Sequence, residues 1–352
     1  MQIFPRLPAE WEPHAATWLA WPHNARDWPS KFAPIRWVYA EIVRHLAESE
    51  PVRILIRSQR QEQEVRGLLA RAHADLNRVS FFHIPTNRVW TRDYCPAFVQ
   101  DQNGNVAAVR AGFNGWAKYP DHELDAAVPE KISQALNLDI TPMLFQGRPF
   151  ILEGGAIDSN GKGTLLTTEE CLLDQQTQVR NPGLTRADIE TTLRQYLGIS
   201  NVLWLGRGIA GDDTHGHVDD LCRFVNPRTV VLVQEDDPGD DNYEALRENR
   251  ERLESARLED GSRPELVPLP MPRPLFFENT RLPASYANFY IGNQVVIVPT
   301  FNDPQDRVAL GILAELFPNR RVVGVHAVDL VWGFGTLHCL THEQAAPITT
   351  SP

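Results

Sequence analysis

A histidine and a cysteine stand side by side, His338 and Cys339, in the glycine-flanked stretch GTLHCLT near the end of the chain. The four cysteines, Cys95, Cys171, Cys222 and Cys339, are far apart and form no CxxC pair, so neither a disulfide framework nor a zinc ribbon is expected. A lone thiol is by default a buried packing residue. It becomes a nucleophile near neutral pH only where a base and a positive field lie beside it.

The densest polar stretch, GDDTHGHVDD at residues 211–220, offers a base. His217 and Asp219 are two residues apart, so on a strand they would face the same side. The stretch is equally typical of a solvated acidic turn. His215, His217 and Asp219 also form an HxHxD pattern, as in some metallohydrolases. That pattern calls for a further histidine where Asp220 stands, so a metal site is the less favoured interpretation.

Two further motifs carry acidic side chains. In WTRDYCP, Asp93 can take two parallel N–H bonds from a planar cation such as a guanidinium, and Trp90 can stack on that cation. The alternative is a structural pair between Arg92 and Asp93 at a strand end. In LEGG, Glu153 precedes two glycines, which permit close backbone approach at a crowded site or mark an exposed bulge.

The elements that must position these residues follow a repeating pattern. A hairpin, a helix and a further strand recur about five times at a period of roughly 50–70 residues. Turn signals stand at the centre of each hairpin, as in AFVQDQNGNVAAV. The pattern predicts a closed, propeller-like α/β fold rather than a doubly wound sheet. The predicted helices lie around residues 60–72, 122–136, 185–197, 242–256 and 304–317.

In a five-bladed closure the inner strands converge on one axis. The polar motifs occupy corresponding places in the units, so their side chains could meet there. The residues that this closure would bring together are Asp93, Glu153, His217, Asn288 and Cys339.

Composition narrows the possible partners. The chain has 352 residues and a formal net charge of −11 with no basic stripe, which disfavours nucleic acid and anionic membranes as partners. No segment approaches the ~20 consecutive apolar residues that cross a bilayer, and the N-terminus lacks a secretory pattern. We therefore expect a cytoplasmic protein with one domain spanning residues 1–352. The proline-rich start and residues 344–352 are expected to be irregular.

Taken together, the motifs resemble those of the agmatine deiminases, in the guanidine-modifying superfamily that also contains the bacterial peptidyl-arginine deiminases. The likeness runs nearly end to end. The matching stretches are LPAEWEPHAATWLAWPHNARDW, WTRDYCP, NGWAKY, LEGGAID, GTLLTTEECLL, WLGRGIAGDDTHGHVDD, PASYANFYIGN, VPTFNDPQDRVAL and HAVDLVWGFGTLHCLT. Two positions depart from the family pattern: Cys95 stands where glycine is usual, and His215 where an acidic residue or asparagine is usual.

The resemblance implies a five-bladed α/β propeller (pentein) that hydrolyses agmatine to N-carbamoylputrescine and ammonia. It implies that Cys339 attacks the guanidinium carbon, that His217 acts as acid and then as base, and that Glu153 orients His217. Asp93 and Asp219 would hold the guanidinium. The other expected substrate-binding residues are Trp90, Trp116, Asp213, Gly216 and Asn288.

Neither a metal nor an organic cofactor is expected, and a homodimer or higher homo-oligomer is left open. The alternatives are a deiminase for free arginine or for peptidyl-arginine, a non-catalytic guanidinium-binding propeller, and a metallohydrolase that uses His215, His217 and Asp219. The intact set of cysteine, histidine and carboxylates argues against the non-catalytic alternative.

Overall fold

The computed structural model describes residues 5–348. Small mixed sheets with a shared strand order recur along this part of the chain. In four of them a strand pairs antiparallel with the next, which pairs parallel with a third that follows a helix. These sheets consist of β4 (Ala97–Gln100), β5 (Val106–Arg110) and β6 (Ile140–Pro142); β9 (Asp158–Ser159), β10 (Thr164–Thr168) and β11 (Asn201–Leu205); β12 (Cys222–Phe224), β13 (Thr229–Gln234) and β14 (Glu265–Pro270); and β17 (Tyr290–Ile291), β18 (Val295–Thr300) and β19 (Arg321–His326).

A further sheet joins the two ends of the chain. It consists of β20 (His342–Ala345), β1 (His14–Ala20), β2 (Val52–Leu55) and β3 (Val79–Phe82) in that order. β20 runs antiparallel to β1, with His342 opposite Trp18, and β1 runs parallel to β2. The prediction of an irregular C-terminus is therefore wrong for residues 344–345, while residues 1–4 and 349–352 lie outside the described part.

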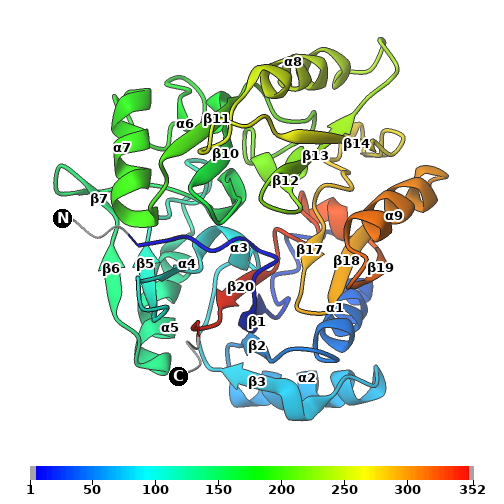
Figure 1. The fold of residues 1–352 in the computed structure, drawn as a ribbon. Coiled ribbons are helices and arrows are strands. Elements are labelled where there is room, and N and C mark those ends of the chain that lie inside the picture. Colours follow the sequence, from blue (N-terminus) through cyan, green and yellow to red (C-terminus); the bar gives the residue numbers. More distant parts are fainter. Residues whose placement is uncertain (1–4, 349–352) are drawn as a thin grey trace.

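Helices follow the inner strands and lie around the outside of the molecule in Figure 1, whereas β1, β20, β12, β17 and the short α3 (Thr91–Tyr94) lie nearer to its centre. Local signals set their ends. α7 begins with a capping box between Thr185 and Asp188 and ends at Gly198, whose φ of 72° suits glycine. The helices are α1 (Phe32–Leu46), α2 (Gln59–Arg71), α4 (Glu123–Ala126), α5 (Val128–Leu136), α6 (Glu169–Leu172), α7 (Arg186–Leu197), α8 (Tyr243–Ser255) and α9 (Gln305–Leu316).

The core lies where the strands are covered on both sides. β13 and β18 read TVVLVQ and VVIVPT, and all but the last residue of each is buried. Continuous apolar runs of this kind are typical of strands with both faces packed. Within the described residues, no helix combines the length and apolar character that crossing a bilayer requires.

The five predicted helices are confirmed within one or two residues by α2, α4 with α5, α7, α8 and α9. Two local predictions are wrong. Gly335–Thr341 is a turn before β20, not a strand-like stretch, and the segment after His217 is a short 3₁₀ helix, η3 (Val218–Asp220). His217 and Asp219 are therefore not placed by the alternation of a strand.

Candidate active site

Cys339 lies at the wall of a pocket of about 720 Å³. The turn that carries it follows the 3₁₀ helix η4 (Leu330–Gly333) and passes close to Trp90. A Cβ added at Gly335 would lie 2.9 Å from a ring carbon of Trp90 and 3.1 Å from the Cβ of Cys339, so the turn needs glycine there. The expected site residues that line this pocket are Trp90, Asp93, Trp116, Asp213 and Cys339.

Asn288 holds the cysteine. Its Nδ2 donates to Cys339 Sγ at 3.0 Å and to Asp220 Oδ1 at 2.9 Å, and its Oδ1 accepts from the backbone N–H of His338 at 3.0 Å. Asn288 does not line the pocket, so it contacts the thiol from within the protein. Burial raises the pKa of the Cys339 thiol well above its usual value, and the nearby aspartates raise it further. In the empty pocket the thiol is therefore protonated, and a bound cation would favour the thiolate.

Asp93, on α3, is fixed by two neutral donors. Its Oδ2 accepts from the indole N–H of Trp116 at 2.9 Å, and its Oδ1 accepts from the backbone N–H of Gly155 at 3.0 Å. Burial raises the pKa of Asp93 to about 6. The alternative of a structural pair with Arg92 is wrong, because Arg92 pairs with two glutamates, Glu10 and Glu343.

His217 lies beside Asp93, with 3.8 Å between His217 Nδ1 and Asp93 Oδ1. Burial acts to lower the pKa of His217, but the charge of Asp93 and the contact with Cys171 outweigh it and raise the pKa well above its usual value. Gly155 makes this packing possible. A Cβ there would lie 2.6 Å from His217 Nδ1 and 2.9 Å from Asp93 Oδ1, which explains the second glycine of LEGG.

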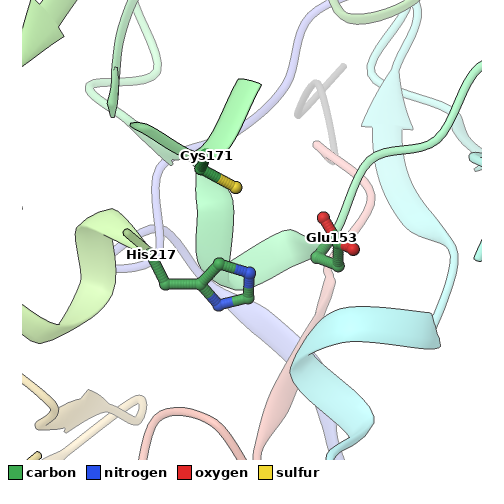
Figure 2. Close-up of side chains that lie close together, drawn as sticks. All are labelled: Glu153, Cys171 and His217. Carbon is green, nitrogen blue, oxygen red and sulfur yellow. The ribbon is translucent and has the colours of Figure 1, made fainter. Parts of the chain in front are cut away.

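Glu153 is near His217 but is not hydrogen-bonded to it within the described part of the chain. Its Oε1 accepts from Arg180 Nε at 3.1 Å, and both side chains are fully buried. Glu153, Cys171 and His217 each offer an atom within 4.8 Å of the others. Figure 2 shows the three side chains gathered at this place. Neither Cys171 nor Arg180 was expected at the site, because nothing in their local sequence distinguishes them from a packing thiol and a surface arginine.

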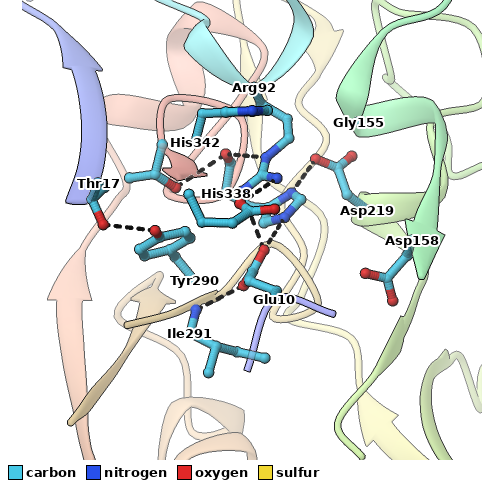
Figure 3. A network of polar contacts seen from close by, with 12 residues as sticks. Glu10, Thr17, Arg92, Gly155, Asp158, Asp219, Tyr290, Ile291, His338 and His342 are labelled. Carbon is cyan, nitrogen blue, oxygen red and sulfur yellow. Dashed lines mark hydrogen bonds and ion pairs between the residues drawn. The ribbon is translucent and has the colours of Figure 1, made fainter. Parts of the chain in front are cut away.

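Asp219 also lies beside the thiol. Its Oδ2 is 3.7 Å from Cys339 Sγ and 2.7 Å from His338 Nδ1 (Figure 3). Burial acts to raise the pKa of Asp219, but the hydrogen bond from His338 and the charges of His338 and His217 lower it below its usual value. His338 was not among the expected site residues, although its place directly before Cys339 could have signalled it.

The remaining expected residues fall into two groups. Asp213 faces the pocket, but its carboxylate pairs with Lys118 and accepts from the Tyr119 hydroxyl at 2.7 Å. Gly216 does not line the pocket. Its φ of 91° and the close approach of Glu170, 2.9 Å from an added Cβ, give it a structural role in the turn before His217.

His215 turns away from His217. Its Nε2 lies 2.7 Å from Asp174 Oδ2, and its Nδ1 lies 3.7 Å from Glu170. Among residues 5–348, the side chains close enough to share a metal ion are Glu153 with Cys171 and His217, and Asp219 with Asp220 and Cys339. His215, His217 and Asp219 do not form such a set, so the geometry does not support the HxHxD interpretation.

Comparison with known proteins identifies the family. The sequence model for the Porphyromonas-type peptidyl-arginine deiminase matches residues 6–345. An agmatine deiminase of Pseudomonas aeruginosa (strain LESB58) is 36% identical over 366 residues, covering 97% of this chain and 96% of that protein. The structure of the Enterococcus faecalis agmatine deiminase has a TM-score of 0.88 at 31% identity and covers 98% of this chain and 96% of its own.

A C. jejuni agmatine deiminase with substrate bound gives a TM-score of 0.86 at 30% identity, covering 98% of this chain and 97% of that one. Sequence and structure therefore agree over nearly the whole length. This chain belongs to the Porphyromonas-type peptidyl-arginine deiminase family.

Proposed function

We propose that this enzyme hydrolyses agmatine to N-carbamoylputrescine and ammonia through a covalent amidino-cysteine intermediate. The geometry around Cys339 carries the proposal: Asp219 Oδ2 lies 3.7 Å from its thiol, and Asp93 lines the same pocket. Two carboxylates beside a thiol suit a planar cation, since each can accept N–H bonds from a guanidinium. Relatives named agmatine deiminase, one of them with substrate bound, support the same substrate.

Each polar side chain then has a role in the reaction. Asp93 and Asp219 hold the guanidinium, whose charge lowers the pKa of the Cys339 thiol and so favours the thiolate. The thiolate attacks the central carbon, an S–C bond forms, and the C–N bond to the departing nitrogen breaks. His217 gives that nitrogen a proton, so ammonia leaves.

The second half of the reaction regenerates the enzyme. His217, now neutral, takes a proton from water, whose oxygen bonds to the amidino carbon. The C–S bond then breaks, which releases the carbamoyl product and the thiol of Cys339. Glu153 lies close to both Cys171 and His217. It would act on His217 through its charge rather than through a direct hydrogen bond.

The rest of the pocket bears on the tail of the substrate. Trp90 and Trp116 supply aromatic walls for the cation, and Asp213 contributes an acidic group. An acidic pocket favours a terminal ammonium over a carboxylate. Arg26 and Arg88 also line the pocket, and together with the family's description they keep free arginine or peptidyl-arginine as the second candidate substrate.

Ammonia release over a panel of guanidino compounds tests the substrate. We expect agmatine to give the highest kcat/KM, above free arginine and above a peptide ending in arginine. Asp213→Asn should reduce that preference. Equal or better turnover of either carboxylate substrate by the wild-type enzyme would assign the enzyme to the second candidate.

The architecture completes the proposal. We infer a single domain over residues 1–352, built as a five-bladed α/β propeller (pentein). The shared strand order of the sheets and the pairing of β1 with β20, which would close the ring, support this inference. A cytoplasmic location and the state of assembly stay predictions, as does a reaction without metal or organic cofactor.

A further inference from the structure

His338 is buried directly behind the thiol, and each of its ring nitrogens faces a carboxylate. Nδ1 lies 2.7 Å from Asp219 Oδ2 and Nε2 lies 2.7 Å from Glu10 Oε2 (Figure 3). Neutral imidazole has one N–H and one lone pair, so one of these short contacts would set a lone pair against a carboxylate oxygen. With two protons on the ring, both contacts become charge-assisted hydrogen bonds.

Glu10 is held as a fixed anion at the far end of this pair. Its oxygens accept from the backbone N–H of Ile291 at 2.8 Å and from Arg92 Nη2 at 3.1 Å, and Arg223 Nη2 lies 3.0 Å away. Burial acts to raise the pKa of Glu10, but the charges of Arg223 and His338 and the His338 hydrogen bond hold it well below its usual value. Glu10 therefore stays ionised and does not take the proton from His338.

We propose that His338 is a positioning residue for the reaction: its doubly protonated ring, braced by Glu10, keeps Asp219 ionised and aimed at the guanidinium beside Cys339. This inference rests on the proposed function. His338 does not line the pocket of Cys339, and it acts through Asp219. It makes Asp219 ready to accept N–H bonds before the substrate arrives.

The surroundings of Asp219 explain why such a partner is needed. The carboxylate is fully buried, and burial alone would favour its protonated form. The negative charge of Asp93 acts in the same direction, and His217, which also favours the ionised form, gives up its proton during the reaction. The charged and titratable groups around Asp219 are His338, His217, Arg223, Asp93, Asp220 and Cys339.

The test compares His338→Gln with His45→Gln. Both histidines are buried and lie near a glutamate, but His45 is on α1, where its Nε2 lies 3.8 Å from Glu41. In the wild type Asp93, with a pKa of about 6, sets the acid limb of kcat/KM for agmatine. Without the charge of His338 the pKa of Asp219 should rise past this value, so the acid limb should move to higher pH by about one unit or more. We expect kcat/KM at pH 7 to fall on the order of 10-fold in His338→Gln, with the limb unmoved in His45→Gln.

A second measurement is independent of the substrate. Nitrogen NMR of enzyme labelled in histidine should show two protonated ring nitrogens for His338 as well as for His217, and only the signals of His338 should vanish in His338→Gln. Glu10→Gln removes the brace, so it should move the acid limb in the same direction as His338→Gln. A neutral ring at His338, or an acid limb shared by wild type and His338→Gln, would overturn the inference. If the wild type releases ammonia only from another guanidino compound, the proposed function fails, while the NMR result still decides the state of His338.

Discussion

Asp93 and Asp219 stand near the same thiol in opposite electrostatic surroundings. Asp93 accepts from two neutral donors, Trp116 and Gly155, and burial raises its pKa to about 6. Asp219 accepts from His338, and its pKa is lowered. One carboxylate is thus ionised in the empty enzyme, while the other titrates near neutral pH and gains most from a bound cation. Under the proposed function, Asp219 is the prepared half of the guanidinium site, because it is ionised before the substrate binds. Asp93 is the responsive half, because its pKa falls when the cation binds.

This difference limits the charge that the empty site must bear. Two fully ionised carboxylates in a buried site repel each other, and both raise the pKa of the thiol. A bound substrate cation weakens the repulsion between the two carboxylates and lowers the pKa of Asp93 and of the Cys339 thiol. Under the proposed function, the same binding event completes the ionisation of Asp93 and favours the thiolate of Cys339, which couples binding to nucleophile formation.

Cys339→Ser should have the largest effect, because a serine hydroxyl is scarcely ionised in these surroundings. We expect kcat to fall by on the order of 10⁴ or more while the carboxylates stay in place. Calorimetric titration of this variant with agmatine would then measure binding by the two aspartates without turnover. Cys222→Ser, in β12, is the control and should keep most of its activity. A Cys339→Ser enzyme with near wild-type kcat would disprove the nucleophile assignment.

Replacing each aspartate in turn tests the difference between Asp93 and Asp219 directly. Asp219→Asn removes an anion and leaves the charge of His338 without its partner, so it should lower kcat/KM on the order of 10³-fold. Asp93→Asn leaves the neutral donors Trp116 and Gly155 in place. Although it also removes a charge that raises the pKa of His217, it should cost less, on the order of 100-fold. Asp260→Asn, which breaks an exposed pair with Arg228, is the control. Equal losses, or a larger loss for Asp93→Asn, would contradict the assignment of the prepared half to Asp219.

The sequence was sufficient to identify most of these groups but not the contacts that make them differ. Helical periodicity and turn signals predicted the five helices and the hairpins, since those depend on local patterns. The partners that set the charge of Asp219 are far away in sequence: His338 is 119 residues from Asp219, and Glu10, which pairs with His338, is 328 residues from it. Tertiary packing also brings His217 to Glu153 and Cys171.

Some local predictions failed for a related reason. The turn at Gly335–Thr341 and the 3₁₀ helix after His217 are short, irregular segments that tertiary contacts hold in place. Asn288, for instance, was expected to line the guanidinium pocket, yet its amide bonds to Cys339 and Asp220 from within the protein. Such roles depend on whether a side chain faces the pocket or the protein interior, and the sequence alone does not specify this.

Trp116→Phe should have a smaller effect on kcat/KM, and it should act through Asp93 alone. It removes the N–H that Asp93 accepts, a bond that lowers the pKa of Asp93 against the effect of burial. The pKa of Asp93 should therefore rise above 6, and kcat/KM should fall about 10-fold at pH 6 but recover as the pH rises. The pH profile of agmatine hydrolysis measures this, with Phe113→Leu, a neighbour without an N–H, as the control. A loss that is the same at every pH would show that Trp116 acts by packing alone.

The last expected effect is on stability, and its dependence on pH differs between the two aspartates. The pKa of Asp93 is about 6 in the folded state and about 3.9 when unfolded, so the folded state binds more protons between these values. The free energy of unfolding therefore falls as the pH rises through this window, by up to about 3 kcal/mol from this one group. In Asp93→Asn that loss is absent, so the variant should gain stability relative to wild type from about pH 4 to pH 7.

Asp219 behaves in the opposite way, because its folded pKa is lowered. Its contribution to stability is complete above the unfolded pKa of about 3.9 and is lost only as the pH falls through the folded value. The deficit of Asp219→Asn relative to wild type should therefore stay constant between about pH 4 and pH 7. Urea unfolding of both variants and wild type across this range measures the two slopes. A rising difference for Asp219→Asn, or a flat one for Asp93→Asn, would mean that the two carboxylates do not differ in charge in the empty enzyme.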